Sequence, residues 1–188
     1  MVVYRKPTCS LDKCVQFIGQ CGVYTHCELY CPEMMHNGKL GWVFTNFSCR
    51  VMELTQESIW EYRNDPELFD SHEILIRPDQ HAALIRWNQD LVSDKCAYNY
   101  SDLFLHLLPK FVAHALVPDD KDMLLNPPTK LYCAQAVILA LRYALRPKHR
   151  ISQLLVDINI HLCKPSCIAD KLSVLFGKPI EMHCLPVV

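Results

Sequence analysis

The sequence predicts a single α+β domain, and two observations support this fold class. The chain has 188 residues, of which 51% are hydrophobic and 21% charged, a balance typical of one globular domain with a sizeable core. Strand-like and helix-like segments are mixed along the chain, and two strand-like runs near its start carry a hairpin signal between them. Strands joined as a hairpin and followed by helices favour α+β.

The predicted strands are segments rich in β-branched and aromatic residues, and they are residues 2–5, 23–31, 42–52, 71–77 and 154–162. Asn37 and Gly38 lie between the second and third of these segments. Asn-Gly between two strand-like runs is a strong hairpin signal. The connection is longer than two residues, so the turn type stays open.

The predicted helices show apolar residues at helical spacing, and they are residues 10–20, 78–93, 98–116, 127–147 and 167–177, with 55–64 as a short helix or turn. Ser10 and Pro78 are typical of helix starts, and Gly177 of a helix end. Pro109 is expected to break or kink the segment 98–116. The apolar stretch 104–112 is interpreted as part of a core helix rather than a lipid-binding surface.

Composition excludes several classes of function. A net charge of −1 implies no bulk attraction to nucleic acid or membranes, and the basic stretch 146–150 is interpreted as a solvated turn. No apolar window reaches the roughly 18 residues of a membrane span. The first nine residues do not resemble a signal peptide. Eleven cysteines, an odd number at irregular spacing, indicate reduced thiols, so we expect a soluble, cytoplasmic protein.

A zinc-binding module is an alternative, because cysteine and histidine gather in two regions. Residues 21–31 hold three cysteines, and the tail holds His161, Cys163, Cys167, His183 and Cys184. Structural zinc sites usually contain two tight cysteine or histidine pairs. Only the pair 163–167 approaches that spacing, so we expect neither a metal nor a cofactor.

Cys133 is the cysteine most suited to chemistry. It lies near the start of the apolar helix that follows Pro127 and Pro128, with Thr129 as the predicted N-cap. Free N–H groups and the helix dipole favour an anion there, and they lower the pKa of a thiol. The alternative is that Cys133 is only a small buried residue.

His26 is the predicted partner of Cys133. Strand alternation places His26, Glu28 and Tyr30 on one face, and Cys27, Leu29 and Cys31 on the other. A histidine beside a carboxylate can act as a general base, although a structural, hydrogen-bonded histidine is the alternative. We interpret the other histidines considered, His72, His81, His106 and His114, as structural.

The order of four motifs resembles a known family. THCELY (25–30), GWVFTNFSCRVME (41–53), YNYSDL (98–103) and LYCAQAVILALRYAL (131–145) are similar to the permuted branch of the papain-like NlpC-type cysteine hydrolases. This branch includes bacterial lipoprotein-like hydrolases, relatives of lecithin:retinol acyltransferase, and members encoded by large DNA viruses. The resemblance spans residues 1–146. It implies a circularly permuted papain-like fold, in which a small antiparallel sheet packs against the cysteine-bearing helix.

The resemblance also implies roles for individual residues. Cys133 would be the nucleophile and His26 the general base of a hydrolase or acyltransferase that cleaves an amide or ester through a thioester. The third residue normally lies on the next strand, where Thr45 and Asn46 are the nearest matches and neither is a carboxylate. The site is therefore either a dyad or assisted by Glu28.

Substrate and context stay open at the level of sequence. A peptide, a lipid ester or a ubiquitin-like conjugate would each suit the predicted chemistry. A catalytically inactive relative that binds a host protein, in the host cytoplasm if the chain is viral, is the second hypothesis. The presence of both Cys133 and His26 favours the enzyme. The tail, 151–188, is predicted to be an extension of the single domain 1–188, and no role is assigned to it.

Overall fold

A computed structural model gives the fold of this chain, and it describes residues 1–8, 13, 16, 22–32, 40–45, 53–58, 65–94, 96–117, 129–145 and 149–182. Two predicted features lie outside these residues: the helix 10–20, apart from Lys13 and Gln16, and the Asn-Gly turn. The described part is α+β, as the sequence predicts.

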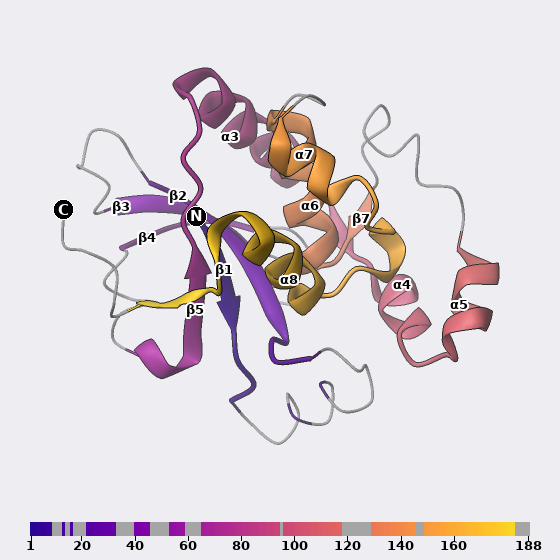
Figure 1. Ribbon diagram of the computed structural model, residues 1–188. Helices are drawn as coiled ribbons and strands as arrows, with labels where there is room; N and C mark the ends of the chain where they lie inside the picture. The colour runs from indigo at the N-terminus through magenta and orange to yellow at the C-terminus, as the bar shows by residue number, and fades with distance from the viewer. Residues whose placement is uncertain are drawn as a thin grey trace.

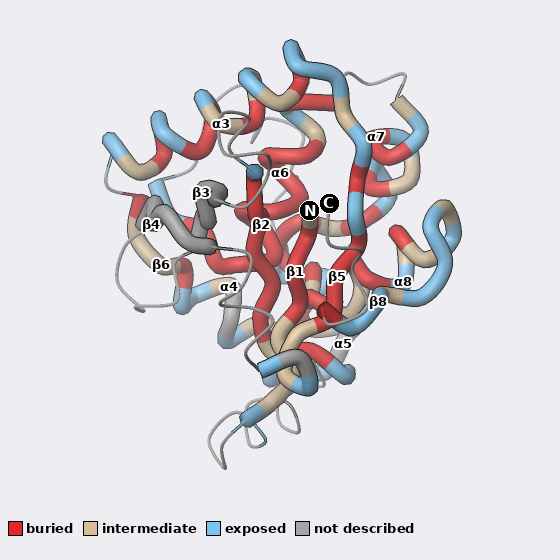
Figure 2. The backbone as a smooth tube through the Cα atoms, turned by 90° about the vertical axis from the view of Figure 1, so that its left-hand side faces the viewer, coloured by how far each residue is buried: buried red, intermediate tan, exposed pale blue. Residues whose placement is uncertain are grey.

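An antiparallel sheet of six strands forms one layer of the molecule (Figure 1). Its strands, in spatial order, are β4 (Glu53–Ser58), β3 (Leu40–Thr45), β2 (His26–Pro32), β1 (Val2–Arg5), β5 (Phe69–His72) and β8 (Ile180–Glu181). Strand β1 is central, with Val2 opposite both Leu29 of β2 and His72 of β5. These central strands are buried along most of their length, as the red tube in Figure 2 shows.

Helices cover one face of this sheet. They are α3 (Pro78–Ser93), α6 (Cys133–Ala144), α7 (Arg150–Leu155) and α8 (Pro165–Phe176), which lie on the same side of β1 and β2 in Figure 1. Helix α6 is the centre of this layer, because it packs against β2 and also against α3, α7 and α8. The short helices α4 (Tyr100–Leu105) and α5 (Lys110–Leu116) extend away from the sheet.

The core forms where α6 meets β2. Ile138, Leu139 and Ala140 are completely buried on α6, and Cys27 and Leu29 face them from the strand. Burying an aliphatic side chain of this size contributes about 1.5–3 kcal/mol. This contact fixes the position of α6 on the sheet, and with it the position of its first residue.

Strand alternation in β2 agrees with the sequence pattern. Cys27, Leu29 and Cys31 belong to the main core beneath α6, whereas Tyr30 packs on the opposite face with Val3. Period-2 alternation is the property of an extended strand that places neighbouring side chains on opposite faces.

Two predictions in the first half of the chain are wrong. Residues 55–64 were expected as a short helix or turn, but residues 53–58 form strand β4, which pairs with all of β3. Pairing with a neighbouring strand outweighs the weak local preference of this polar segment. The predicted strand 71–77 is displaced, because β5 covers Phe69–His72 and residues 73–77 form no strand.

The predicted strand in the tail is also wrong. Residues 154–162 contain the end of α7 and a 3-10 helix, η3 (Ile160–Leu162). Asn159 caps η3, because its side chain accepts a hydrogen bond from the His161 N–H at 3.0 Å. A short apolar run does not by itself distinguish strand from buried helix. Packing of α7 and η3 against α6 decides this case.

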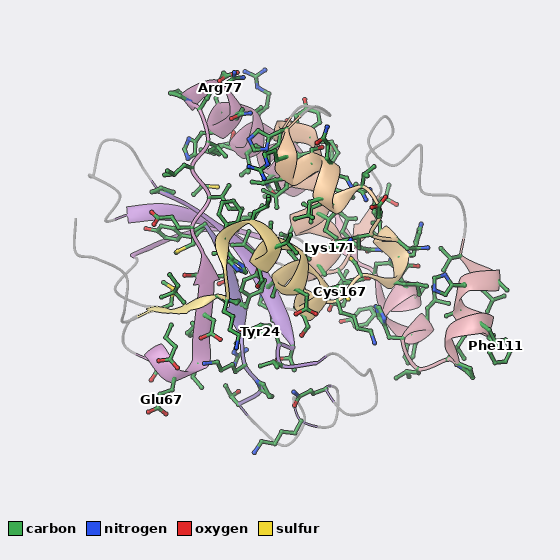
Figure 3. All side chains as sticks on the ribbon, viewed as in Figure 1. Tyr24, Glu67, Arg77, Phe111, Cys167 and Lys171 are labelled. Carbon is green, nitrogen blue, oxygen red and sulfur yellow. The ribbon has the colours of Figure 1, made fainter. Side chains whose placement is uncertain are left out.

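The segment before Pro109 is not a core helix. Pro109 does separate α4 from α5, as predicted. However, Phe104 is 64% exposed and Phe111 is 78% exposed, and Figure 3 shows Phe111 at the outer edge of the molecule. None of the helices in the described part of the chain has both the length and the apolar character that crossing a bilayer requires.

Candidate active site

Helix α6 begins at Cys133 itself. Tyr132, with φ −105° and ψ 170°, is the N-cap residue, so the predicted cap at Thr129 is wrong. Residues 130–131 form the short strand β7, which pairs in parallel with β6 (Ala97–Tyr98), and this extended backbone delays the start of the helix. Cys133 is therefore the first helical residue, where the N–H groups have no partner within the helix.

His26 is the first residue of β2, and its neighbour on the same strand face is Glu28. The Nε2 atom of His26 lies 3.3 Å from Oε2 of Glu28. Both residues are buried, with 8% and 9% of their surface exposed. A carboxylate at this distance orients the imidazole ring and favours its protonated form.

Cys133 is in hydrogen-bonding contact with both His26 and Cys27. The hydrogen bond from Cys27 lowers the pKa of Cys133 most strongly, burial opposes the shift, and the His26 imidazolium lowers the pKa further. The result is a pKa well below that of an ordinary thiol. The structure thus places the predicted nucleophile beside the predicted base, in surroundings that favour the thiolate form of the sulfur.

His26 shows the complementary shift. Burial alone would lower its pKa, but the Cys133 thiolate and the Glu28 carboxylate outweigh burial and raise the pKa to about 10. An imidazolium beside a thiolate is the charge arrangement of an activated cysteine. The two ionised groups stabilise each other in a site that excludes most water.

The remaining predicted site residues, Thr45 and Asn46, are not part of the described site. Thr45 is the last residue of β3 and is paired with Glu53 of β4, and its side chain lies outside the described part. Asn46 lies outside the described residues altogether. Glu28 is therefore the described residue that orients His26.

Backbone carbonyl groups in the tail of the chain form hydrogen bonds with Tyr132, the residue directly before α6. The Tyr132 hydroxyl donates to the carbonyl oxygen of Cys163 at 2.7 Å, and it lies 3.1 Å from the carbonyl oxygen of His161. Tyr132 is 2% exposed, so these bonds are made in a dry environment where they are stronger than in water. Residues 160–163 thus belong to the surroundings of the site, although no role was predicted for the tail.

A second polar network fixes the same helix start. The Gln135 side chain accepts a hydrogen bond from the Tyr132 N–H at 3.0 Å and donates to Oδ2 of Asp102 at 2.6 Å. The ring of His161 donates to the same carboxylate oxygen at 2.5 Å. Burial raises the pKa of Asp102, but the hydrogen bonds from His161 and Gln135 outweigh it and hold the pKa below its usual value.

His106, the residue directly after α4, also lies close to Cys133. Its Nε2 atom is 3.3 Å from the Tyr132 hydroxyl, whose own proton is committed to a backbone carbonyl, so Nε2 must be the donor. Burial and the positive charge of Lys164 lower the pKa of His106 to about 4, despite the opposing effect of Cys133. His106 is therefore a neutral imidazole near the thiolate.

Replacing Glu28 by glutamine should weaken the site without disrupting it. The amide can still accept a hydrogen bond from His26, but the negative charge is lost. A charge-assisted hydrogen bond contributes about 1.5–3 kcal/mol, so the His26 imidazolium should be less stable and the rate of Cys133 labelling by an electrophile near neutral pH should fall roughly tenfold. At high pH, where the Cys133 sulfur is ionised in both proteins, the two rates should converge.

Glu67→Gln is the matched control for this variant. Glu67 is an exposed carboxylate of the 3-10 helix η2 (Pro66–Leu68), and Figure 3 shows it pointing away from the body of the molecule. Its replacement should leave the profile unchanged. An unchanged profile in Glu28→Gln would show that Glu28 does not act on His26.

The described residues contain no group of three or more histidine, cysteine or acidic side chains arranged to hold a metal ion. Two members of the cluster predicted in the tail, His183 and Cys184, lie outside the described residues. Of the other members, His161 binds Asp102 and Cys163 lies 3.5 Å from the Tyr132 hydroxyl. The described thiols are free of disulfides.

Several residues of the site were not predicted from the sequence. Cys27, Gln135, Asp102 and His161 contact Cys133 or the start of its helix. A local signal existed for Gln135, because a glutamine three residues after an N-cap is typical of a capping box. Asp102 lies within the YNYSDL motif, which belongs to the family resemblance, but no local pattern distinguishes this residue from its neighbours.

Comparison of the chain with protein-family models finds no match, and comparisons with curated proteins and with solved structures find no significant similarity. The geometry of the site and the sequence motifs are therefore the basis of any functional assignment.

Proposed function

We propose that this protein is a cysteine-dependent hydrolase or acyltransferase of the papain-like, permuted NlpC type, with Cys133 as nucleophile and His26 as general base. The observation that supports this most directly is the contact between the two residues, in which the pKa of the thiol is lowered and that of the imidazole raised. Perturbed pKa values of this kind are concentrated at functional sites.

The first half-reaction forms a thioester. The Cys133 thiolate attacks the carbonyl carbon of an amide or ester, and a carbon–sulfur bond forms. The bond to the amine or alcohol then breaks, and the His26 imidazolium transfers its proton to the leaving group. Because Nε2 of His26 is occupied by Glu28, the proton is transferred from Nδ1.

The second half-reaction releases the acyl group. The neutral His26 accepts a proton from water, or from an acceptor amine or alcohol, which attacks the thioester carbonyl. The carbon–sulfur bond breaks and the thiolate–imidazolium pair forms again. The Cys133 backbone N–H, at the first position of α6, is suited to stabilise the oxyanion in both steps.

His26 is favoured over His106 as the general base because the pKa values of the two rings make His26 the positively charged one at neutral pH. A histidine that holds a thiolate must be protonated at neutral pH, and the pKa of His106 is about 4. His26 has a pKa of about 10 and meets this requirement. The neutral His106 does not supply the positive charge that lowers the pKa of Cys133.

Labelling by a thiol-directed electrophile tests the proposal. At pH 7 an ordinary cysteine is only a few per cent thiolate, so Cys133 should react roughly 30-fold faster than an ordinary thiol. Cys167 of α8 is the internal reference, because it is partly exposed in the same protein (Figure 3). Mass spectrometry of the labelled peptides measures both rates. Equal rates at the two positions would contradict the proposal.

Substrate panels then distinguish the proposed enzyme from an inactive binding protein. Peptide amides, lipid esters and ubiquitin-like conjugates are the three substrate classes that the chemistry accommodates. An acyl group trapped on Cys133 would identify the class. A reactive Cys133 without turnover of any class would favour the second hypothesis, a protein-binding factor of cytoplasmic location.

A further inference from the structure

Cys27 is placed to react with Cys133 as well as to hydrogen-bond with it. It follows His26 on β2, faces α6, and contacts the Cys133 sulfur through both its thiol and its backbone N–H. Contact with the strand backbone means that the Cys133 side chain already reaches β2. A disulfide, with its sulfur–sulfur bond of about 2.05 Å, would therefore join α6 and β2 where the two elements already pack together.

We propose that Cys27 is a resolving cysteine, which closes a reversible disulfide with Cys133 when a peroxide oxidises the nucleophile. The proposal rests on the reactive thiolate of the proposed function, but not on acyl transfer itself. It makes the pair Cys27–Cys133 a modification site that inactivates the protein and protects its nucleophile.

The chemistry proceeds in two balanced steps. The Cys133 thiolate attacks one oxygen of the peroxide, the O–O bond breaks, and sulfenic acid forms while the second oxygen leaves as hydroxide and takes up a proton. The Cys27 sulfur then attacks the sulfenic sulfur, the S–O bond breaks, and the oxygen leaves as water with the Cys27 proton. The two sulfurs lose two electrons, and one peroxide becomes two waters.

Exposure determines the order of these steps. Cys133 is 7% exposed and Cys27 only 1% exposed, so a small oxidant reaches Cys133 first. Burial and the neighbouring Cys133 thiolate raise the pKa of Cys27, which keeps it protonated in the reduced protein. Oxidation of Cys133 removes that negative charge, and Cys27 then becomes easier to deprotonate.

Other thiols provide controls for the assignment. Cys163 also lies near Cys133, but its thiol is in contact with the Tyr132 hydroxyl instead. Cys31 lies on the same strand and the same face as Cys27, four residues further along. The variant Cys27→Ser retains a hydroxyl that can donate a hydrogen bond to the Cys133 thiolate, but it cannot form a disulfide.

The test uses hydrogen peroxide and the full chain. After brief oxidation and alkylation of free thiols, tryptic peptides are analysed without reduction. Cys133 is the single cysteine between Lys130 and Arg142, whereas the other peptide holds Cys27 together with Cys31 and two further cysteines. We expect a linked pair in wild type, Cys31→Ser and Cys163→Ser, and no link in Cys27→Ser.

Recovery after reduction provides a second measurement. Dithiothreitol should restore labelling of Cys133 in the wild type, whereas in Cys27→Ser the unprotected sulfenic acid proceeds to sulfinic acid, with recovery at least about fivefold lower. If Cys27→Ser does not fold, fragmentation of the wild-type linked peptide still identifies the bridged residues.

Several results would overturn the proposal. A link that persists in Cys27→Ser, or sulfinic acid as the first stable product in the wild type, would show that Cys27 does not resolve the sulfenic acid. If Cys133 labels rapidly with the electrophile but forms no disulfide, the disulfide proposal fails alone. If Cys133 reacts with neither reagent, the proposed function fails with it.

Discussion

Cys133→Ala should abolish turnover, with a loss of about 10⁴-fold or more, because the variant lacks the sulfur on which the proposed thioester forms. The loss is expected in the chemical step rather than in substrate binding. The structural cost is small, since removing one buried sulfur at the start of α6 leaves a cavity smaller than a leucine-to-alanine change would. Thermal unfolding of the variant checks that the fold is retained.

Cys167→Ala is the matched control for Cys133→Ala. Both residues lie near the start of a helix, but Cys167 is partly exposed on α8. Its replacement should leave turnover unchanged. Substantial turnover in Cys133→Ala would show that the thiol is not the nucleophile, and would favour a different group in the same site.

His26→Gln should change the pH dependence of Cys133 labelling. In the wild type the thiolate pKa is lowered, so the rate should be flat across neutral pH and fall only in acid. Without the imidazolium, the pKa of Cys133 rises, while the hydrogen bond from Cys27 continues to lower it. At pH 7 the labelling rate should then fall by up to roughly 30-fold and should increase with pH through the neutral and alkaline range.

The direction of this change follows from the two shifts. The pKa of Cys133 is depressed, so its ionised form is present above that pKa and is lost as the pH falls. The pKa of His26 is raised to about 10, so its positive charge is present below that value and is lost as the pH rises through it. The thiolate–imidazolium pair therefore occupies the interval between the two values.

His106→Gln is the control for the histidine variant. His106 lies near Cys133 but is neutral above a pH of about 4, so its loss should not change the shape of the profile. If the labelling rate of Cys133 in His26→Gln stays constant across neutral pH, Cys27 and the helix start stabilise the thiolate without His26. The proposed general base would then have to be replaced by another residue.

Local sequence patterns predicted the elements that have strong periodicity. The helix 78–93 has the same bounds in the structure, and α8 ends before Gly177, whose φ of +81° is readily adopted by glycine. Strand β2 and its alternation were also predicted. In each case the signal is contained in a few consecutive residues.

Weak or ambiguous patterns gave the wrong elements. Residues 53–58 are polar and form a strand only because β3 lies beside them, and residues 154–162 look like a strand but pack as helical turns against α6. The same limit applies to α6, whose first residue is set by the pairing of β7 with β6. Such choices depend on neighbours that are distant in sequence.

The same distinction between local patterns and long-range contacts applies to the candidate site. The sequence by itself determined that a cysteine lies near the start of an apolar helix and that a histidine and a glutamate share one face of a strand, because both are consequences of short-range periodicity. Only the tertiary structure decided that Cys27 and His26 meet the same sulfur, and that Tyr132, Gln135 and the tail fix the helix start. Those contacts arise when α6 is buried against β2, and no local pattern encodes that packing.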